Sequence, residues 1–170
     1  MTIETSSYQD AINALINVLG SENLLTDEYS RNLYAQDVYT KDLLALAVAR
    51  PANKSQLSEI LKISKEYSIT VVPRGGGMSY TKGYVPSKEN TLMIDMSGMS
   101  RVLEINEQDM YVTVECGCTW KALHEALKGT GLRTPYWGTL SGSKATIGGG
   151  LSQNSVFWGT GQYGTAVDSV

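Results

Sequence analysis

The glycines of this chain are unevenly distributed, and this distribution constrains the fold more than any other feature of the sequence. Of the 17 glycines, only Gly20 precedes position 75. From residue 130 to 170 the only charged residues are Arg133, Lys144 and Asp168, while Gly, Ser and Thr are dense and aromatic residues are interspersed. Low charge combined with aromatic residues indicates ordered backbone that packs against protein or a ligand, and argues against a solvated linker.

Composition excludes several classes of protein. The 170 residues are 42% hydrophobic and 18% charged, which suits one ordinary domain with a buried core. The net charge of -3 leaves no surplus of cations for a nucleic acid. No apolar run approaches the roughly 20 residues of a membrane span, and the N-terminus lacks a signal peptide, so we expect a soluble, cytoplasmic protein. The sequence stops without a cap or closing element, and we expect the chain to be a fragment of something longer.

Hydrophobic spacing and capping residues predict the elements of the first half. These elements are a helix over about 8–19 ended by Gly20, a loop with a helical turn over 26–42, a strand over 43–50, a helix capped by Asn53 and carrying Leu57, Ile60, Leu61 and Tyr67, and a strand over 69–72. The last three form a strand, helix, strand unit, which predicts a parallel crossover with its helix packed on the sheet.

The second half reads as short strands followed by loops. Its predicted elements are neighbouring strands over 91–96, 101–105 and 111–115, a helix capped by Thr119 and ended by Gly129 and Gly131, a helical turn near Gly149, and the start of a strand over 168–170. The predicted fold class is α+β: a small α/β subdomain with a crossover helix, and the beginning of a second, antiparallel-sheet subdomain that is incomplete at Val170. We expect residues 1–42 to be an N-terminal helix and lead-in, and residues 43–170 to be the main domain.

Two glycine-rich loops are the candidate binding elements. The strand over 69–72 runs into Pro73-Arg74-Gly75-Gly76-Gly77-Met78-Ser79. Consecutive glycines leave backbone N–H groups uncovered, which suits a diphosphate, although the same loop could be a flexible turn whose glycines serve geometry alone. If the loop binds phosphate, we expect Gly76→Val to reduce binding more than folding, because the side chain would lie where the phosphate sits and would resist the glycine backbone angle. The second loop runs from Thr139 to Gly150 and again offers backbone donors and small hydroxyls.

Two motif matches in the second half are rejected. Residues 159–164 fit G-x-G-x-x-G, but no predicted strand leads into them and no acidic ribose partner follows. Residues 138–144 look like a Walker A loop, but the spacing is wrong and Ala145 stands where Ser or Thr must meet magnesium.

Taken together, the loops resemble a known family. The runs VVPRGGGMS, CGCTW with the helix after it, KATIGGGLSQNS and GQYGTAVDSV resemble, in order and spacing, the FAD-binding domain of the vanillyl-alcohol oxidase and para-cresol methylhydroxylase superfamily. The resemblance covers about Tyr34 to Val170 and is greatest to bacterial FAD-linked oxidases and dehydrogenases, among them enzymes that oxidise D-lactate and glycolate. It implies that both loops hold the FAD pyrophosphate through backbone amides and that the last run helps to enclose the adenosine half.

The glycine-rich segments and the resemblance together supply the predicted cofactor-binding residues. They are Pro73, Arg74, Gly75, Gly76, Gly77, Met78, Ser79, Thr139, Leu140, Gly142, Thr146, Ile147, Gly148, Gly149, Gly150, Asn154, Gly161, Gly164 and Val167. The resemblance itself implies 74–79, 146–150, Gly164 and Val167. Several members of the superfamily attach the flavin to a histidine at the position of Met78, so we expect non-covalent FAD here. For Arg74 the sequence leaves two alternatives open, a charge at the phosphate or a pair with a surface carboxylate.

Other reactive residues have structural explanations. His124, the only histidine, is expected to be a partly exposed helix residue. Cys116 and Cys118 with one distant histidine fall short of a structural zinc site, so no metal is expected. Trp137, Phe157 and Trp158 could stack on a flavin or adenine ring, although such aromatics mostly fill cores or subunit contacts.

The resemblance implies the FAD-binding portion of an FAD-dependent oxidoreductase that oxidises a small hydroxylated substrate such as a 2-hydroxy acid. The substrate would bind through a C-terminal domain, so no catalytic residue is named and the fragment alone is expected to be inactive. An electron-acceptor partner or peripheral membrane association of the full protein is compatible with this interpretation. The alternatives are a flavin-binding electron-transfer module without its own substrate site, and a plain phosphate or nucleotide binder or a fragment that holds nothing.

Overall fold

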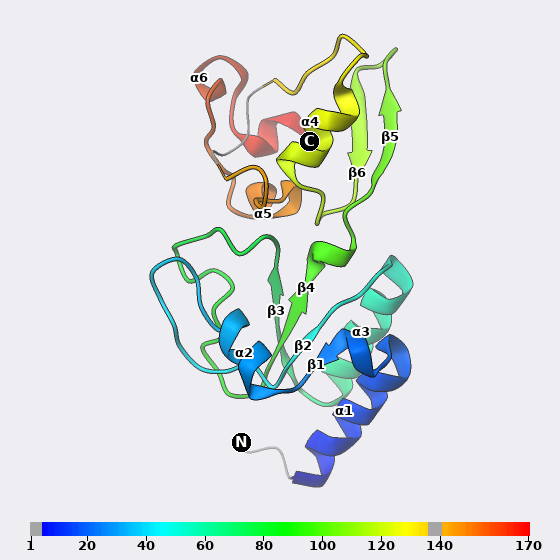
Figure 1. Ribbon diagram of the computed structural model, residues 1–170, viewed down its shortest axis with the longest axis vertical. Coiled ribbons are helices and arrows are strands. Elements are labelled where there is room, and N and C mark those ends of the chain that lie inside the picture. The colour runs from blue at the N-terminus through cyan, green and yellow to red at the C-terminus, as the bar shows by residue number, and fades with distance from the viewer. Residues whose placement is uncertain (1–4, 136–140) are drawn as a thin grey trace. The chain divides into compact units, whose positions relative to one another are not determined.

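The computed structural model describes residues 5–135 and 141–170, and these residues form two compact units. Unit 1 comprises Met1–Arg74 and Ser79–Gly98, and unit 2 comprises Gly75–Met78 and Met99–Val170. The glycine-rich residues Gly75–Met78 therefore belong to unit 2, although unit 1 flanks them on both sides in the sequence. Figure 1 labels the elements of each unit.

A mixed sheet forms the centre of unit 1. Its strands are β1 (Leu24–Leu25), β2 (Ala47–Ala49), β3 (Thr70–Arg74) and β4 (Thr91–Asp95), in the spatial order β1-β2-β4-β3. Strands β2 and β3 each run parallel to β4, and β1 is antiparallel to β2. The predicted parallel crossover is confirmed, with α3 (Lys54–Glu66) between β2 and β3 in the sequence, but β4 separates these two strands in the sheet. Burial explains the central place of β4, because all five of its residues are buried.

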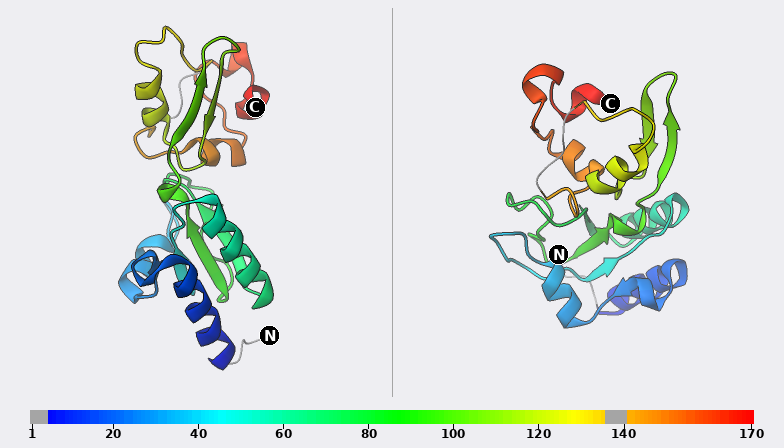
Figure 2. Two further views of the ribbon diagram at one scale, coloured as in Figure 1. Left: turned by 90° about the vertical axis from the view of Figure 1, so that its right-hand side faces the viewer. Right: turned by 45° about the horizontal axis from the view of Figure 1, so that its top comes forward.

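The first helix ends and α3 begins at the predicted residues, whereas the first helix starts at Thr5, three residues before the predicted start. Helix α1 (Thr5–Leu19) ends at Gly20, which adopts φ of 81°. Helix α3 begins after Asn53, whose side chain accepts a hydrogen bond from the Gln56 N–H at 2.9 Å. The predicted apolar stripe of α3 is wrong at Leu61, which is 47% exposed. The buried Ser64 faces inward instead, because its hydroxyl is satisfied by the Ile60 carbonyl at 2.8 Å. Figure 2 shows α1 and α3 side by side from a second direction.

Two segments of unit 1 differ from the prediction in extent. The loop expected over 26–42 contains a two-turn helix, α2 (Glu28–Tyr34), which begins because the Asp27 carboxylate accepts a hydrogen bond from the Ser30 N–H at 2.8 Å. Of the strand expected over 43–50, only the residues of β2 form a strand.

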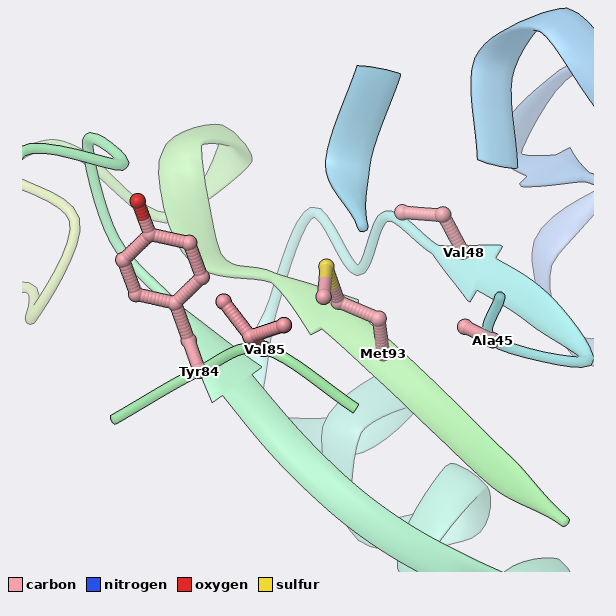
Figure 3. Packing of buried hydrophobic residues seen from close by; sticks show 5 residues of the cluster. All are labelled: Ala45, Val48, Tyr84, Val85 and Met93. Atoms are coloured by element: carbon pink, nitrogen blue, oxygen red, sulfur yellow. The ribbon is translucent and has the colours of Figure 1, made fainter. Parts of the chain in front are cut away.

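One core cluster of this unit consists of Ala45, Val48, Tyr84, Val85 and Met93, shown in Figure 3.

Unit 2 is built on a hairpin and one covering helix. Strands β5 (Val102–Asn106) and β6 (Tyr111–Val114) pair antiparallel, and α4 (Trp120–Leu127) starts at Thr119, whose hydroxyl accepts from the Ala122 N–H at 3.1 Å. Its core cluster contains Cys118, Leu123 and Leu127, packed against Val102, Ile105, Val112, Val114, Leu132 and Ile147. The prediction that the strands over 91–96, 101–105 and 111–115 are neighbours is thus confirmed for the last two and wrong for the first, which pairs with β2 and β3 in unit 1.

The end of the chain is helical. Short helices α5 (Ile147–Ser152) and α6 (Thr160–Tyr163) and the 3₁₀ helix η3 (Ala166–Ser169) follow one another; η1 (Ser21–Asn23) and η2 (Met96–Gly98) are the other 3₁₀ turns of the described chain. The strand expected over 168–170 is wrong, because the Asp168 carboxylate accepts hydrogen bonds from both the N–H and the hydroxyl of Thr165 and closes a local turn. The predicted α+β class, an α/β part and an antiparallel part, is confirmed. In the described residues no helix combines the length and apolarity needed to cross a bilayer.

Candidate functional site

The first glycine-rich loop, Gly75–Met78, leaves the end of β3 with unbonded backbone donors. Gly77 has φ of 68°, and no other residue of the loop has a positive φ. This change in the sign of φ is the backbone geometry that turns successive N–H groups toward one side as an anion nest. Among the described residues, the N–H groups of Gly76 and Met78 find no hydrogen-bond acceptor. The loop therefore fits a negatively charged group such as a phosphate.

The two glycine-rich loops, predicted separately, contact each other inside unit 2. A Cβ atom on Gly76 would collide with the carbonyl oxygen of Lys144, and one on Gly75 would collide with Oγ1 of Thr146. Both collisions are with packed atoms of the second loop, and the Lys144 carbonyl belongs to the backbone. Gly75 and Gly76 are therefore needed so that the segment Lys144–Thr146 can lie directly against the first loop.

The second loop uses its backbone donors within the protein. Thr146 caps α5, because its hydroxyl accepts from the Gly149 N–H at 3.2 Å and its carbonyl accepts from the Gly150 N–H at 3.0 Å. The Ile147 N–H donates to the Cys118 carbonyl at 2.8 Å, and the Gly148 N–H donates to the Cys116 carbonyl at 3.0 Å. Four successive amides are thus bonded internally. That Thr146 to Gly150 bind phosphate remains a prediction. In the structure, the segment Lys144–Thr146 of this loop packs against the first loop.

Close packing explains the glycines of the second loop. A Cβ atom on Gly148 would lie 2.7 Å from the Cβ of Cys116, and one on Gly150 would lie 3.3 Å from the ring of Phe157. Phe157 itself packs edge-to-face on Trp120, with ring centroids 4.9 Å apart. Of the three aromatics considered for stacking, Phe157 is half-buried against Trp120, Trp158 is 78% exposed, and Trp137 lies outside the described residues.

The remaining predicted residues of unit 2 lie at the start of the second loop or after it in the sequence. The Asn154 amide oxygen accepts from the Val167 N–H at 3.3 Å, which joins two of them. Gly164 adopts φ of 84°, and Gly161 lies in open space. The Gly142 carbonyl accepts from the Lys121 N–H at 2.9 Å. Thr139 and Leu140 lie outside the described residues.

The rejected G-x-G-x-x-G match has a local explanation. Gly159, with φ of 113°, and Gly164 stand at the two ends of α6, and no strand of the described chain leads into this helix. These glycines supply the left-handed backbone of helix termini.

Arg74, at the end of β3 in unit 1, is held by aromatic rings. Its guanidinium carbon lies 4.7 Å from the centroid of the Tyr34 ring and 5.3 Å from that of Tyr84. The Tyr34 hydroxyl donates to Oδ2 of the buried Asp95 at 2.6 Å, and burial together with this hydrogen bond raises the pKa of Tyr34 to about 12. Neither alternative left open by the sequence describes these contacts. Sequence reasoning missed Tyr34, Tyr84 and Asp95 because they come from three distant segments with no shared spacing.

Two further predicted residues belong to unit 1. Pro73 precedes Arg74 in β3, in register with Ile94 of β4. The Ser79 hydroxyl lies 3.0 Å from the Thr81 hydroxyl, and the Ser79 carbonyl accepts from the Val38 N–H at 3.3 Å.

Cys116 and Cys118 support the second loop through their carbonyl groups, and the imidazole of His124 lies on α4. Cys118 is fully buried, and burial raises the pKa of its thiol; Cys116 is a free cysteine as well. His124 is exposed on α4, as predicted. The described residues contain no group of three or more His, Cys, Asp or Glu side chains placed to hold a metal ion.

Comparison with known proteins identifies similar sequences of named function. The model of a family described as FAD binding domain matches residues 45–170. The glycolate oxidase subunit GlcD of Bacillus subtilis is 32% identical over 148 residues, which are 86% of this chain and 31% of that protein. The mitochondrial D-lactate dehydrogenase [cytochrome] of Arabidopsis thaliana is 33% identical over 165 residues, 95% of this chain and 28% of that protein. The chain thus spans about 30% of the length of these relatives.

Solved structures show the same fold. The 4-ethylphenol oxidase from Gulosibacter chungangensis superposes with a TM-score of 0.70 at 28% identity, over 83% of this chain and 29% of that chain. p-Cresol methylhydroxylase superposes with a TM-score of 0.80 at 17% identity, over 91% of this chain and 31% of that chain. The second likeness, at its low identity, concerns the fold alone.

Proposed function

The chain belongs to the FAD binding domain family, and on that premise we propose that it is the FAD-binding part of an oxidoreductase that oxidises a small 2-hydroxy acid. The cofactor is FAD. One observation carries the assignment of the site. Two glycine-rich loops that are about 70 residues apart in the sequence meet in unit 2, and the first of them keeps unbonded amide donors.

In this proposal the chain's own residues hold the diphosphate of FAD. The N–H groups of Gly76 and Met78 would donate to phosphate oxygens, and the segment Lys144–Thr146 would keep the loop in place from below. Bound FAD would supply the redox chemistry by accepting two electrons from a substrate carbon, which leaves positioning and exclusion of competing reactions to the protein. No residue of this chain is assigned a catalytic role.

We propose that the flavin is bound non-covalently through this loop. Met78 stands at the position where several members of the superfamily carry a histidine attached to the flavin, and a thioether cannot form the same stable linkage. His124 does not replace that histidine in our proposal, because it lies on the exposed surface of α4.

The substrate and the partners are proposed from the relatives. Glycolate and D-lactate, the compounds in the names of two of them, are both 2-hydroxy acids. We propose that the substrate pocket is completed by a further domain, as the chain spans about 30% of these relatives. An electron-acceptor protein, as the word cytochrome in one relative's name suggests, is the proposed partner.

The test uses the protein expressed from its complete coding sequence. Its visible spectrum is recorded as purified, and again after FAD is added to a colourless preparation. We expect a flavin band whose chromophore separates from the polypeptide on denaturation. Colour that stays with the denatured polypeptide would overturn the non-covalent site, and no binding of added FAD would overturn the proposed function.

The substrate class is tested on the same preparation under anaerobic conditions. Addition of D-lactate or glycolate is expected to bleach the flavin band, and L-lactate and acetate serve as controls for stereochemistry and for the hydroxyl group. A flavin that dithionite reduces but no 2-hydroxy acid bleaches would retain FAD binding and overturn the substrate class.

A further inference from the structure

A cluster of four residues surrounds the end of β3 in unit 1 and is not explained by the proposed contacts to FAD. Tyr34 on α2 and Tyr84 both place their rings within 5.3 Å of the Arg74 guanidinium carbon. Asp95 lies opposite Arg74 in the parallel register of β3 and β4. We call these residues, Tyr34, Arg74, Tyr84 and Asp95, the arginine cage.

The walls of the arginine cage are fixed by the core. Tyr84 belongs to the buried cluster with Val48 and Met93, and its hydroxyl end points away from those residues (Figure 3). Tyr34 is fixed from the other end, because its hydroxyl donates to Oδ2 of Asp95 at 2.6 Å. The second carboxylate oxygen of Asp95 accepts from the Ser97 N–H at 3.0 Å, so the carboxylate that anchors Tyr34 is itself held.

Stability alone does not account for an arginine at this position. The Nε atom of Arg74 is buried and has no hydrogen-bond partner among the described residues. Leaving a buried donor without an acceptor costs stability, which an apolar residue between the two rings would avoid. A guanidinium between two aromatic faces is attracted by both and keeps little rotational freedom.

We propose that Arg74 is a positioning residue: the arginine cage fixes its side chain, and thereby the peptide bond from which the loop Gly75–Met78 leaves β3. This inference rests on the proposed FAD site and adds a role for Tyr34, Tyr84 and Asp95. The Arg74 guanidinium is engaged by the two tyrosine rings and by a side-chain hydrogen bond with Tyr84, and in this proposal its side chain is not a phosphate ligand. The cage makes FAD binding tighter by holding the donor loop in one conformation before the cofactor arrives.

The experiment is a double-mutant cycle on the protein expressed from its complete coding sequence. The dissociation constant of FAD is measured by quenching of flavin fluorescence for the wild type, Arg74→Met, Tyr34→Leu and the double variant. We expect each single substitution to weaken binding about tenfold, and the double variant to bind no more weakly than about tenfold, because both changes dismantle one cage. Tyr29→Leu is the matched control, since Tyr29 lies on the same helix and is 82% exposed.

Two further measurements separate positioning from a structural or a direct role. Tyr34→Phe keeps the ring over Arg74 and loses the Asp95 hydrogen bond, and we expect it to restore FAD affinity to within about threefold of the wild type. Hydrogen exchange of the FAD-free protein should show faster exchange confined to residues 75–79 in Arg74→Met. The dependence of FAD affinity on salt should be the same in Arg74→Met and the wild type, because no phosphate contact is lost.

The outcomes distinguish this inference from the function on which it rests. A wild type that binds no FAD would overturn both. A wild type that binds FAD while Tyr34→Leu binds as the control does would overturn the cage and keep the function. A weaker salt dependence in Arg74→Met, with additive losses in the double variant, would make Arg74 a direct phosphate ligand and overturn the inference.

Discussion

The two glycine-rich loops of this protein have similar compositions and use their backbones in opposite ways. In Gly75–Met78 the N–H groups of Gly76 and Met78 have no acceptor among the described residues, whereas the four N–H groups from Ile147 to Gly150 all donate within unit 2. Gly75 and Gly76 of the first loop and Gly148 and Gly150 of the second share one property, which is that another segment passes close to the position a side chain would take. Glycine content therefore indicates close approach, and only the hydrogen bonds tell whether the approaching group is the protein itself or a ligand.

The largest expected effect comes from Gly76→Val. The new side chain would displace the Lys144 carbonyl, so we expect the free energy of unfolding to fall by about 3 kcal/mol and FAD binding to be lost with it. This corrects the expectation that binding suffers more than folding through a strained backbone angle, because Gly76 has no positive φ and its open side faces protein.

Urea denaturation followed by FAD titration checks this prediction. Gly161→Val is the matched control, because nothing lies within 4 Å of the position, and its stability should stay within about 0.5 kcal/mol of the wild type. An unchanged denaturation midpoint in Gly76→Val would show that the two loops do not pack as described.

Gly148→Ala tests the packing of the second loop rather than that of the first. A methyl group there would meet the Cβ and the carbonyl oxygen of Cys116 at 2.7 Å, and we expect a loss of about 2 kcal/mol in the free energy of unfolding. Since the Gly148 amide already donates to Cys116, the folded variant should keep most of its FAD affinity. Thermal melting with and without FAD measures both quantities. A large loss of affinity at unchanged stability would mean that this loop contacts the cofactor directly.

Thr146→Val removes the cap of α5 while preserving the shape of the side chain. We expect the free energy of unfolding to fall by about 1 kcal/mol, because the Gly149 N–H loses its acceptor. Thr146→Ser keeps the hydroxyl and should retain the protection of the Gly149 amide in hydrogen exchange. Equal protection in Thr146→Val would show that the cap does not hold this amide.

The smallest expected effect is a dependence of stability on pH that arises from Glu115, next to Cys116 in the sequence. Hydrogen bonds from the Arg101 side chain and backbone hold the pKa of Glu115 below its ordinary value of 4.5. The unfolded chain then takes up the proton at a higher pH than the folded one, so this contribution to stability is present above pH 4.5 and is lost as the pH falls below it. Glu115→Gln should show a shallower fall in melting temperature over that range. If the melting temperature of the variant depends on pH as that of the wild type does, Glu115 does not contribute to the loss of stability in acid.

Sequence patterns predicted those features of the fold that depend on neighbouring residues. The caps at Asn53 and Thr119 and the turn at Gly20 follow from local hydrogen bonds and backbone angles, and all three are confirmed. The place of β4 was not predictable in the same way, because parallel partners are chosen by burial against distant strands. Its run of buried residues was the available signal, since a strand covered on both faces is typical of the centre of a parallel sheet.

In the candidate site too, features that depend on neighbouring residues were predictable and contacts between distant segments were not. The sequence pointed to both glycine-rich loops, because consecutive glycines are a local signal, and it had no means of showing that Gly76 rests on Lys144. Neither could it place Arg74 between Tyr34 and Tyr84, which lie 40 residues before and 10 residues after it in the chain. Such contacts arise from the topology of the fold, and the spacing of residues along the sequence does not predict them.

The sequence position of Gly75–Met78 has a consequence for how the protein is made on the ribosome. Every residue of unit 1 has been synthesised once residue 98 is added, but the loop belongs to unit 2 and rests on Lys144–Thr146. At about 5–20 residues per second, roughly 3 to 14 s pass between synthesis of the loop and synthesis of its support. After β4 has been synthesised within that interval, β3 can pair with β4 while Gly75–Met78 still lacks its support. Translation speed over residues 79–146 therefore sets how long the loop Gly75–Met78 is open to misfolding and proteolysis.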